Sequence, residues 1–366
     1  MFSESHPLLR RIIRFALLPY CFLRLVNWKE CTKSRFQVAI DLLYIFFVLN
    51  DYPDNYGACR LWELDRARWA LYYGSNYNPY QKSKLRKEVN PLSLQVVFND
   101  KQVCDLLCRG IGVNVPRCWG TVDAGDDLGA NLRAAFKASR TSSLIVKPVY
   151  GHAGIGVRMA VKKADGIEIR TGMGSEAVED CAVLERCIIQ EVVTQDPRLS
   201  AIAPSSINTI RVLTMYTKAK RVMVIGASMR FGVGDSIVDN WSAGGVAVGV
   251  NHETGRLLGV GYDKRGNRYL RHPISEFEFK DFEIPQWEKV VDIATSVQMA
   301  CTFNRLLGMD VAVTESGVVL IEINADADIV FQEQTSGPLF ANRSTWEAFS
   351  EYGLFVNRFQ KHLYDG

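Results

Sequence analysis

The stretch GMDVAVTESGVVLIEIN, residues 308–324, decides the fold. Its β-branched and aliphatic residues form two runs around residues 315–317, a pattern typical of two buried strands joined as a hairpin. Asp310 and Glu322 interrupt these runs with negative charge. Because a buried carboxylate needs a partner, the two residues mark the hairpin as a candidate functional site.

The register expected for this hairpin brings the two carboxylates together. A three-residue loop with Gly317 in the left-handed region pairs Thr314 with Val318. Counting back along both strands then places Asp310 opposite Glu322 on one face, since side chains alternate along a strand.

Asn324 follows on the same face as Glu322. Two adjacent carboxylates repel each other unless a cation lies between them, and oxygen ligands at this spacing suit Mg²⁺ or Mn²⁺. The alternative is an exposed hairpin whose polar face meets solvent, although Val318 and Leu320 are expected on that face too. We predict a metal site formed by Asp310, Glu322 and Asn324.

A metal of this kind implies a nucleotide, and cations for its phosphates occur upstream. Lys147 lies in the apolar strand 142–149 and precedes a glycine-containing turn, 150–156. Backbone N–H groups of such a turn can approach phosphate closely, although an ordinary turn explains the pattern equally well. Arg211 and Arg230 lie within apolar strands, where a phosphate or a structural ion pair would satisfy each guanidinium.

The chain of 366 residues is long enough for two or three packed units, and its hydrophobic content of 48% is ordinary for a globular protein. The net charge is +3, but residues 1–40 carry seven basic side chains against Glu4 and Glu30, so the remainder is close to neutral. That distribution does not fit a nucleic-acid-binding protein, which spreads a basic face over its folded body.

The nine cysteines show no CxxC pair, and only five histidines accompany them. A chain of this size does not depend on a disulfide framework. We therefore expect reduced thiols, a cytoplasmic location and no structural zinc site.

The apolar runs 15–23 and 42–49 are shorter than the roughly 18 to 20 residues that span a bilayer. In the helix expected before residue 24, Arg10, Arg11 and Arg14 share one sector and the apolar residues fill the opposite arc. Such a helix either packs its apolar arc on the domain or lies on an anionic membrane surface. The second alternative would place the protein at the inner face of the membrane.

Residues 1–95 are expected to be helical and aromatic-rich, and residues 99–116 and 287–307 each fit one helix. Besides the hairpin, strands are expected at residues 142–149, 158–163, 187–193, 207–217, 221–232, 239–251 and 256–264. The pattern predicts an α+β fold in which antiparallel strands dominate the second half.

Taken in order, four segments resemble the ATP-grasp superfamily: NDKQVCDLLCRGIGVNVP (99–116), LIVKPVYGHAGIGV (144–157), IIQEVV (188–193) and the hairpin. Four more resemble its sugar-transfer-associated family: PSSINTIRVLT (204–214), VDNWSAGGVAVGV (238–250), RHP (271–273) and LIEIN (320–324). The resemblance covers roughly residues 95–340 and implies two α+β subdomains that sandwich ATP. The expected division is 1–95 helical, 96–186 N-terminal subdomain with a lid hairpin, 187–340 C-terminal subdomain, and 341–366 a C-terminal helix.

The resemblance also implies roles for individual residues. Phosphate contacts and the lid would come from Lys101, Lys147, Gly151, Gly154 and Gly156. The hinge that reads adenine would be Gln190, Glu191 and Val193. One or two Mg²⁺ ions would be held by Asp310, Glu322 and Asn324. The catalytic and acceptor residues would be Arg211, Arg230, Asp239, Asn240 and His272, although a plain structural turn explains His272 equally well.

One position departs from the related D-alanine–D-alanine ligases, which carry an arginine two residues before the first metal aspartate. This chain has Gly308 there, and we expect Arg211 to take over the charge-stabilising role. Asp239 is the residue expected to accept the amine proton.

The activity implied is an ATP-dependent ligase in which a carboxylate forms an acylphosphate and an amine or hydroxyl displaces phosphate. Its partners would be a small carboxylate and a sugar or amine acceptor, within surface-polysaccharide synthesis. Two alternatives share the ATP site: a kinase acting on a sugar or polyol, and a non-catalytic nucleotide-binding partner of a glycosyltransferase complex.

Overall fold

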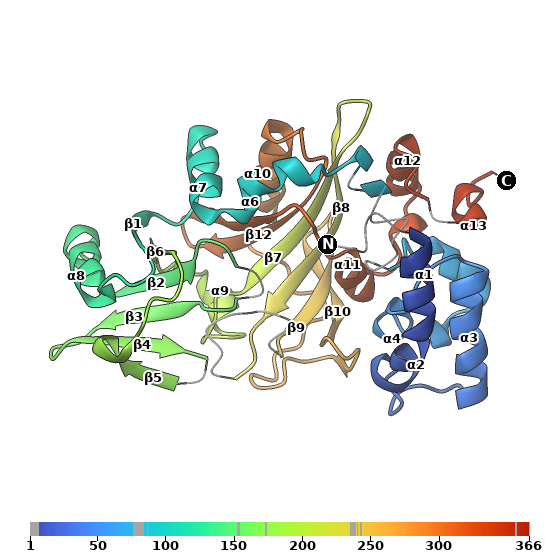
Figure 1. The fold of residues 1–366 in the computed structure, drawn as a ribbon, viewed down its shortest axis with the longest axis horizontal. Helices are drawn as coiled ribbons and strands as arrows, with labels where there is room; N and C mark the ends of the chain where they lie inside the picture. Colours follow the sequence, from blue (N-terminus) through green and yellow to red (C-terminus); the bar gives the residue numbers. More distant parts are fainter. Residues whose placement is uncertain are drawn as a thin grey trace.

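Two antiparallel sheets and a group of N-terminal helices make up the protein (Figure 1). The computed structural model describes residues 7–75, 84–85, 87–151, 154–172, 174–234, 239, 241, 244–355 and 357–365. The α+β class expected from the sequence and the helical N-terminal region are both confirmed.

The first sheet has six strands in the order β1-β6-β2-β3-β4-β5. Their bounds are β1 Cys118–Val122, β6 Cys187–Glu191, β2 Ser143–Pro148, β3 Arg158–Lys162, β4 Ile167–Thr171 and β5 Gly174–Ala177. Helix α8 (Leu128–Ser139) covers one face and shares a buried apolar core with the strands. Because β6 pairs with both β1 and β2, the expected domain boundary between residues 186 and 187 falls inside this sheet and is wrong.

The second sheet has seven strands in the order β11-β10-β9-β8-β7-β12-β13. Their bounds are β11 Arg268–Tyr269, β10 Arg256–Tyr262, β9 Val246–Asn251, β8 Val222–Phe231, β7 Thr209–Tyr216, β12 Leu306–Thr314 and β13 Gly317–Asn324. Helix α10 (Trp287–Ala300) packs on one face, and α6 (Val96–Asn99) and α7 (Lys101–Gly110) share that core. Residues 96–110, expected in the N-terminal subdomain, therefore pack on the C-terminal sheet.

The register of the β12–β13 hairpin differs from the expected one at its turn. Thr314 pairs with Gly317, so the loop has two residues, and Gly317 does not have a positive φ. Asp310 still pairs with Glu322, because a bulge shifts the register between Asp310 and Val311. The bulge has a useful consequence: Val318 and Leu320 point into the apolar core, whereas Glu322 shares the face of Asp310.

Helix α11 (Ile329–Ser336) lies on the other face of the second sheet, against β8, β9 and β10. Two glycines permit this approach: a Cβ at Gly249 would lie 2.3 Å from the carbonyl oxygen of Thr335, and one at Gly226 would lie 2.7 Å from the Gln332 side chain. The Ser228 and Thr335 hydroxyls are 2.6 Å apart across the contact. The sequence places α11 directly after β13, so its first turn reaches the same edge of the sheet as Glu322.

The N-terminal helices pack beyond α11, on the side away from the first sheet (Figure 1). They are α1 Pro7–Ala16, α2 Leu18–Tyr20, α3 Arg35–Phe47 and α4 Asn55–Ala58. Aromatic residues fill their core, among them Tyr56, Trp62 and Trp69. None of the described helices is both long and apolar enough to cross a membrane.

The C-terminal segment forms two short α-helices, α12 (Arg343–Glu351) and α13 (Arg358–Lys361), where one was expected. Gly353 adopts a φ of +62° between them, a conformation that ends α12 and turns the chain. The other short helical segments are η1 Cys21–Leu25, η2 Leu61–Glu63, η3 Arg66–Leu71, η4 Leu92–Leu94, η5 Val178–Asp180, α9 Pro197–Ser200 and η7 Leu339–Ala341.

Candidate ATP-binding and ligation site

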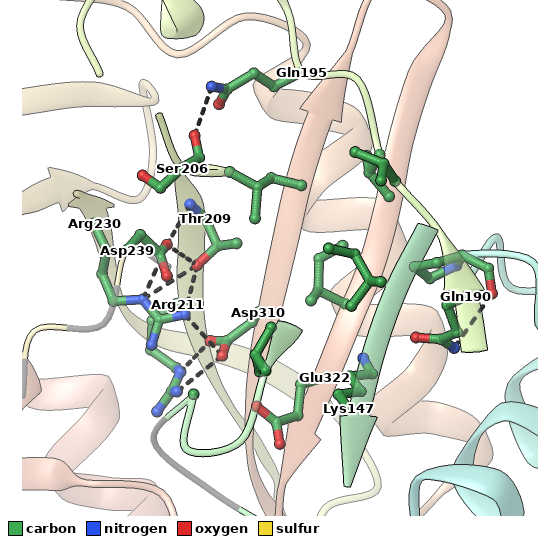
Figure 2. A pocket seen from close by; sticks show the side chains of 18 of the residues that line it. Lys147, Gln190, Gln195, Ser206, Thr209, Arg211, Arg230, Asp239, Asp310 and Glu322 are labelled. Atoms are coloured by element: carbon green, nitrogen blue, oxygen red, sulfur yellow. Dashed lines mark hydrogen bonds and ion pairs between the residues drawn. The ribbon is translucent and has the colours of Figure 1, made fainter. Parts of the chain in front are cut away.

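A cleft of about 650 Å³ lies between the two sheets. Figure 2 shows Lys147 and Gln190 entering it from the first sheet, opposite a charged group on the second sheet. Residues expected in the site that line the cleft are Lys101, Lys147, Gly151, Gly154, Gln190, Glu191, Val193, Arg211, Arg230, Asp239, Asp310, Glu322 and Asn324. The fold therefore gathers segments more than 200 residues apart into one cavity.

The charged group on the second sheet forms a row across three neighbouring strands. Arg211 on β7 is directly opposite Asp310 on β12, and Asp310 is directly opposite Glu322 on β13. Directly opposed residues have their Cβ atoms about 5 Å apart on one face. The row thus runs cation, anion, anion, and the last carboxylate lies beside Lys101 of α7 and Lys147 of β2.

Asp310 is held by two arginines. The Arg211 guanidinium donates to both of its carboxylate oxygens, one contact measuring 3.0 Å, and Arg230 Nη2 lies 2.8 Å from Oδ2. The Asp310 side chain is only 4% exposed. Burial alone would raise its pKa, but the charges of Arg211 and Arg230 outweigh burial and hold the pKa below its ordinary value. The carboxylate is therefore ionised and its orientation is fixed.

Arg230 is oriented in turn by Asp239 and Thr209. The Thr209 hydroxyl donates to Asp239 Oδ2 at 2.5 Å and accepts from Arg230 Nε and Nη2 at 3.1 and 2.5 Å. Asp239 Oδ2 also lies 3.5 Å from Arg230 Nε and accepts the Thr209 backbone N–H at 2.7 Å. Burial raises the pKa of Asp239, a shift that the Arg230 charge opposes. Asp239 therefore anchors Arg230.

Gly308 makes room for Arg211. A Cβ at position 308 would lie 3.3 Å from Arg211 Cδ and 2.9 Å from the Ala327 Cβ. The side chain of Arg211 thus crosses over a position where any larger residue would displace it. Arg211 reaches Asp310 from the neighbouring strand β7. Gly308, two positions before Asp310 on β12, has no side chain to obstruct it.

Two lysines supply positive charge on the other side of Glu322. Lys101 Nζ lies 3.8 Å from Glu322 Oε1 and donates to the Gly151 carbonyl at 2.7 Å. Lys147 is partly buried, and burial lowers its pKa, while the Glu322 charge acts in the opposite direction. The pKa of a buried lysine falls because the protein cannot replace the water around an ammonium group. An anion that enters the cleft would stabilise the charged form of Lys147 in place of that water.

The turn after β2 is tied to the start of α7. Asp100 caps α7 by accepting the N–H groups of Gln102 and Val103, and it also accepts the Tyr150 hydroxyl at 2.6 Å. Within the turn, Gly154 has a φ of +70°, a conformation that favours glycine.

The third lid glycine does not line the cleft. Gly156 has a φ of +74°, and a Cβ there would lie 2.8 Å from Pro148 Cγ. Its role is to let the turn fold against β2.

The side chains of the expected hinge are held by the segment before β1. Gln190 Nε2 donates to the Pro116 carbonyl at 3.4 Å, and Glu191 Oε1 accepts the Arg117 N–H at 2.9 Å. Both residues line the cleft together with Val193. Because these side chains have partners within the protein, recognition by the hinge would fall to its backbone groups.

A family model described as sugar-transfer associated ATP-grasp matches residues 80–345. The chain belongs to this family. No curated protein matches it.

The chain is also similar to several solved ATP-grasp structures at low identity. They include D-alanine–D-alanine ligase from Helicobacter pylori, 11% identical over 73% of this chain and 64% of that one, with a TM-score of 0.40. The ATP-grasp ligase PsnB with minimal precursor, Mg and ADP is 17% identical over 79% and 72%, with a TM-score of 0.39. An ADP complex of N5-carboxyaminoimidazole ribonucleotide synthetase is 12% identical over 67%, with a TM-score of 0.38, and the chain spans 47% of its length.

Of the expected catalytic and acceptor residues that the structure describes, His272 lies outside the cleft. His272 is buried, its Nε2 donates to the Gly232 carbonyl at 2.9 Å, and its Nδ1 is 3.1 Å from the Ser275 hydroxyl. It does not line the cleft, and its bonds hold the chain just after β8, which bears Arg230. Asn240 lies outside the described residues.

Sequence reasoning missed several residues of the site. Thr209, which connects Asp239 to Arg230, lies two positions before Arg211, so strand alternation alone could have found it. Trp241 and Phe331 also line the cleft, with ring centroids 5.1 Å apart. Nothing in the local pattern around Phe331 points to the cleft, because α11 reaches it only through tertiary packing.

The donor set on the hairpin fits Mg²⁺ that arrives with a nucleotide. Glu322 and Asn324 present oxygens on the face of Asp310, and the buried Asn324 amide nitrogen has no hydrogen-bond partner among the described residues. Both Asp310 oxygens already accept from arginines. The part of the chain that the structure describes contains no group of three or more His, Cys, Asp or Glu placed to hold a metal. The site therefore fits an ion completed by phosphate oxygens and water.

Proposed function

We propose that this chain is an ATP-dependent ligase that joins a carboxylate to an amine or hydroxyl through an acylphosphate. One observation carries the proposal: Lys101, Lys147, Arg211 and Arg230 line a single cleft around the Asp310–Glu322 pair. Two lysines lie on one side of the pair and two arginines on the other. A reaction that moves a phosphoryl group toward an acyl acceptor needs positive charge on both sides of the transferred group.

The nucleotide would occupy the side of the cleft next to the first sheet. Lys101 and Lys147 would contact its phosphates, and the turn containing Gly151 and Gly154 would close over them. Residues 190–193 would contact adenine through backbone groups. Bound Mg²⁺, held by Glu322 and Asn324 with Asp310, would neutralise phosphate charge.

The proposed reaction has two steps. A substrate carboxylate oxygen attacks the γ-phosphorus, the bond to the β-phosphate oxygen breaks, and ADP leaves as the acylphosphate forms. An amine nitrogen, or a hydroxyl, then adds to the acyl carbon and expels inorganic phosphate, and the proton lost by the nucleophile is taken up by the leaving phosphate. Arg211 and Arg230 would stabilise negative charge on the acyl oxygen. Asp239 would position Arg230 and would not itself accept the proton.

The acceptor class is proposed as a sugar or a surface-polysaccharide precursor, acted on at the cytoplasmic side of the membrane. The description of the family as sugar-transfer associated supports this class. Trp241 and Phe331 supply an aromatic surface at the cleft, which suits the apolar faces of a sugar ring.

The test is a screen for ADP release with Mg²⁺, in which amino acids are combined with amino-sugar or nucleotide-sugar acceptors. A ligase gives ADP and inorganic phosphate in equal amounts and a product lighter than its two substrates by one water. Phosphate retained on the acceptor would identify a kinase instead. Nucleotide binding without turnover across the screen would favour the non-catalytic alternative.

Glu322→Gln provides the site variant for this screen, because it removes one charge from the cleft with little change in shape. Arg256→Gln provides the matched control, since Arg256 is exposed and pairs with the exposed Glu283 at 3.4 Å. The ligase proposal requires that the first variant loses turnover and the second retains it.

A further inference from the structure

The N-terminal helices carry an unusually large exposed apolar surface. Of the 25 large hydrophobic residues that are exposed in the described chain, 13 lie between Leu8 and Val48. We define the N-terminal apolar face as Leu8, Leu9, Ile12, Ile13 and Phe15 of α1 together with Phe36, Ile40, Leu43 and Phe47 of α3. A contiguous apolar surface of this kind marks a site of interaction.

Helix α1 is packed with its basic side against the protein. Arg11 donates to the Asn50 side chain and to the Phe46 carbonyl, the latter at 3.4 Å, and its guanidinium lies 5.2 Å from the Phe46 ring centroid. The Arg14 guanidinium lies 5.0 Å from the Tyr52 ring centroid. Ile12, by contrast, is 67% exposed. The expectation that α1 packs its apolar arc on the domain is therefore wrong.

Helix α3 continues the apolar surface. Its inner side is buried through Val38, Leu42 and Ile45, whereas Phe36, Ile40, Leu43 and Phe47 form a stripe at helical spacing on the outer side. The Phe15 and Phe47 ring centroids are 5.8 Å apart, and both rings are exposed. This contact makes the surfaces of α1 and α3 continuous.

Basic residues outnumber acidic residues in the segment that carries this face. The only acidic residues between positions 7 and 48 are Glu30 and Asp41, and both are paired. Glu30 lies 3.4 Å from Arg60, and Asp41 lies 2.7 Å from Lys33 and 2.6 Å from Arg66. Three basic residues in the same segment are exposed: Arg24, Lys29 and Arg35.

We propose that the N-terminal apolar face docks the protein on the surface of an anionic lipid bilayer. Helices of 10 and 13 residues that are apolar on one side lie in the plane of the interface and bury that side among the acyl chains. Exposed arginine and lysine attract anionic headgroups. A second copy of the chain fits less well, because a two-fold contact would bring equal positive charges together without an unpaired acid to offset them.

The proposal extends beyond the ligase function, because it would hold for any activity of the cleft. The nine residues of the face come from α1 and α3, and none of them lines the cleft. Membrane docking and nucleotide binding can therefore be measured independently.

The test is co-sedimentation of the full chain with vesicles of phosphatidylcholine, with and without about 30% phosphatidylglycerol. We expect binding to the anionic vesicles that weakens as salt is raised. Ile12→Asp combined with Phe47→Asp should lower the bound fraction at least about tenfold, since two apolar anchors are lost. Arg24→Gln combined with Arg35→Gln should remove the preference for anionic lipid.

Leu184→Asp is the matched control, because Leu184 is 87% exposed but belongs to the first-sheet region. The thermal unfolding temperature and ATP binding should be unchanged in all variants. If the two aspartates impair folding, Ile12→Ser combined with Phe47→Ser provides a less disruptive double variant. Failure of the wild-type chain to bind anionic vesicles overturns the proposal. So does a dimer in solution that dissociates when Phe47 is changed, since that result would identify a second copy as the occupant.

Discussion

At the scale of single residues, the side chain of Arg211 can take its position because the neighbouring residue is Gly308, which has no side chain. Its guanidinium reaches Asp310 across the space above Gly308, where a Cβ would lie 3.3 Å from Arg211 Cδ. From the resemblance to D-alanine–D-alanine ligases we expected Arg211 to replace the arginine that they carry at the position of Gly308. The structure adds the reason why the replacement is compatible with the strand: β7 is the direct neighbour of β12.

Arg211→Lys tests whether the two-pronged contact matters. Lysine keeps the charge but cannot donate to both Asp310 oxygens at once, so negative charge on the acyl oxygen would lose a fixed donor. We expect turnover in the ligation assay to fall about 10²-fold with little change in ATP affinity. Arg256→Lys, at an exposed pair, should retain full turnover. Equal turnover in both variants would show that position 211 contributes charge alone.

Thr209→Val tests the link between Asp239 and Arg230. Valine has nearly the same shape but lacks the hydroxyl that donates to Asp239 and accepts from Arg230. Because both partners are buried, losing the shared hydroxyl should cost about 1–3 kcal/mol of unfolding free energy. Urea unfolding measures this cost. Thr32→Val, at an exposed threonine outside the helices and strands, should change it by less than about 0.5 kcal/mol.

At the scale of elements, the sequence predicted the position of the hairpin but not the strand register around its turn. Alternation correctly indicated two strands, but the turn residues indicated a three-residue loop where the structure has two residues. The Asp310–Glu322 pair is nevertheless as expected, because the bulge offsets this difference. Alternation and turn residues could not indicate the bulge, because that depends on which side of β13 packs against the core under Val318 and Leu320. Likewise, tertiary packing places β7 next to β12 in the sheet. No local sequence pattern therefore predicted that Arg211 would pair with Asp310.

Helix α11 was absent from the sequence prediction for a related reason. Its residues are buried nearly all around, including Gln332 and Glu333, so it lacks the polar face that marks a surface helix. The domain boundaries failed because β6 inserts between β1 and β2, and because α7 packs on the distant second sheet. In each case a contact remote in sequence overrides the local signal.

Gly249→Ala tests the close packing of α11 against the second sheet. The added methyl would lie 2.3 Å from the Thr335 carbonyl oxygen, so helix or strand must shift and the protein should lose about 1–3 kcal/mol. Gly317→Ala is the control, because nothing lies within 4 Å of its added methyl and its φ is not positive. Chemical denaturation should show a near-neutral effect there. A clear loss at position 317 would instead favour the three-residue loop expected from the sequence.

At the scale of the whole molecule, α11 joins the N-terminal helices to the sheet that bears the site. Glu333 is buried at this junction, and its Oε1 accepts the N–H groups of Tyr73 and Leu339 at 2.6 and 3.1 Å. Burial raises the pKa of Glu333 to about 8, and burial likewise raises the pKa of Asp54, in the turn before α4, to about 8. Both carboxyls are therefore protonated in the folded protein at neutral pH, although Oε2 of Glu333 and Oδ1 of Asp54 have no hydrogen-bond partner in the part of the chain that the structure describes.

These two carboxyls predict that the junction weakens in mild alkali. A carboxyl whose pKa is raised by folding contributes stability that is complete below its unfolded pKa and is lost as pH rises through the folded value. Between about pH 7 and about pH 9, each group should remove about 1 kcal/mol of unfolding free energy. Glu333→Gln keeps the acceptor for Tyr73 and Leu339 but cannot ionise, so its loss over this range should be about half as large. Unfolding by urea at a series of pH values provides the measurement, and a wild-type stability that is flat across the range would contradict the prediction.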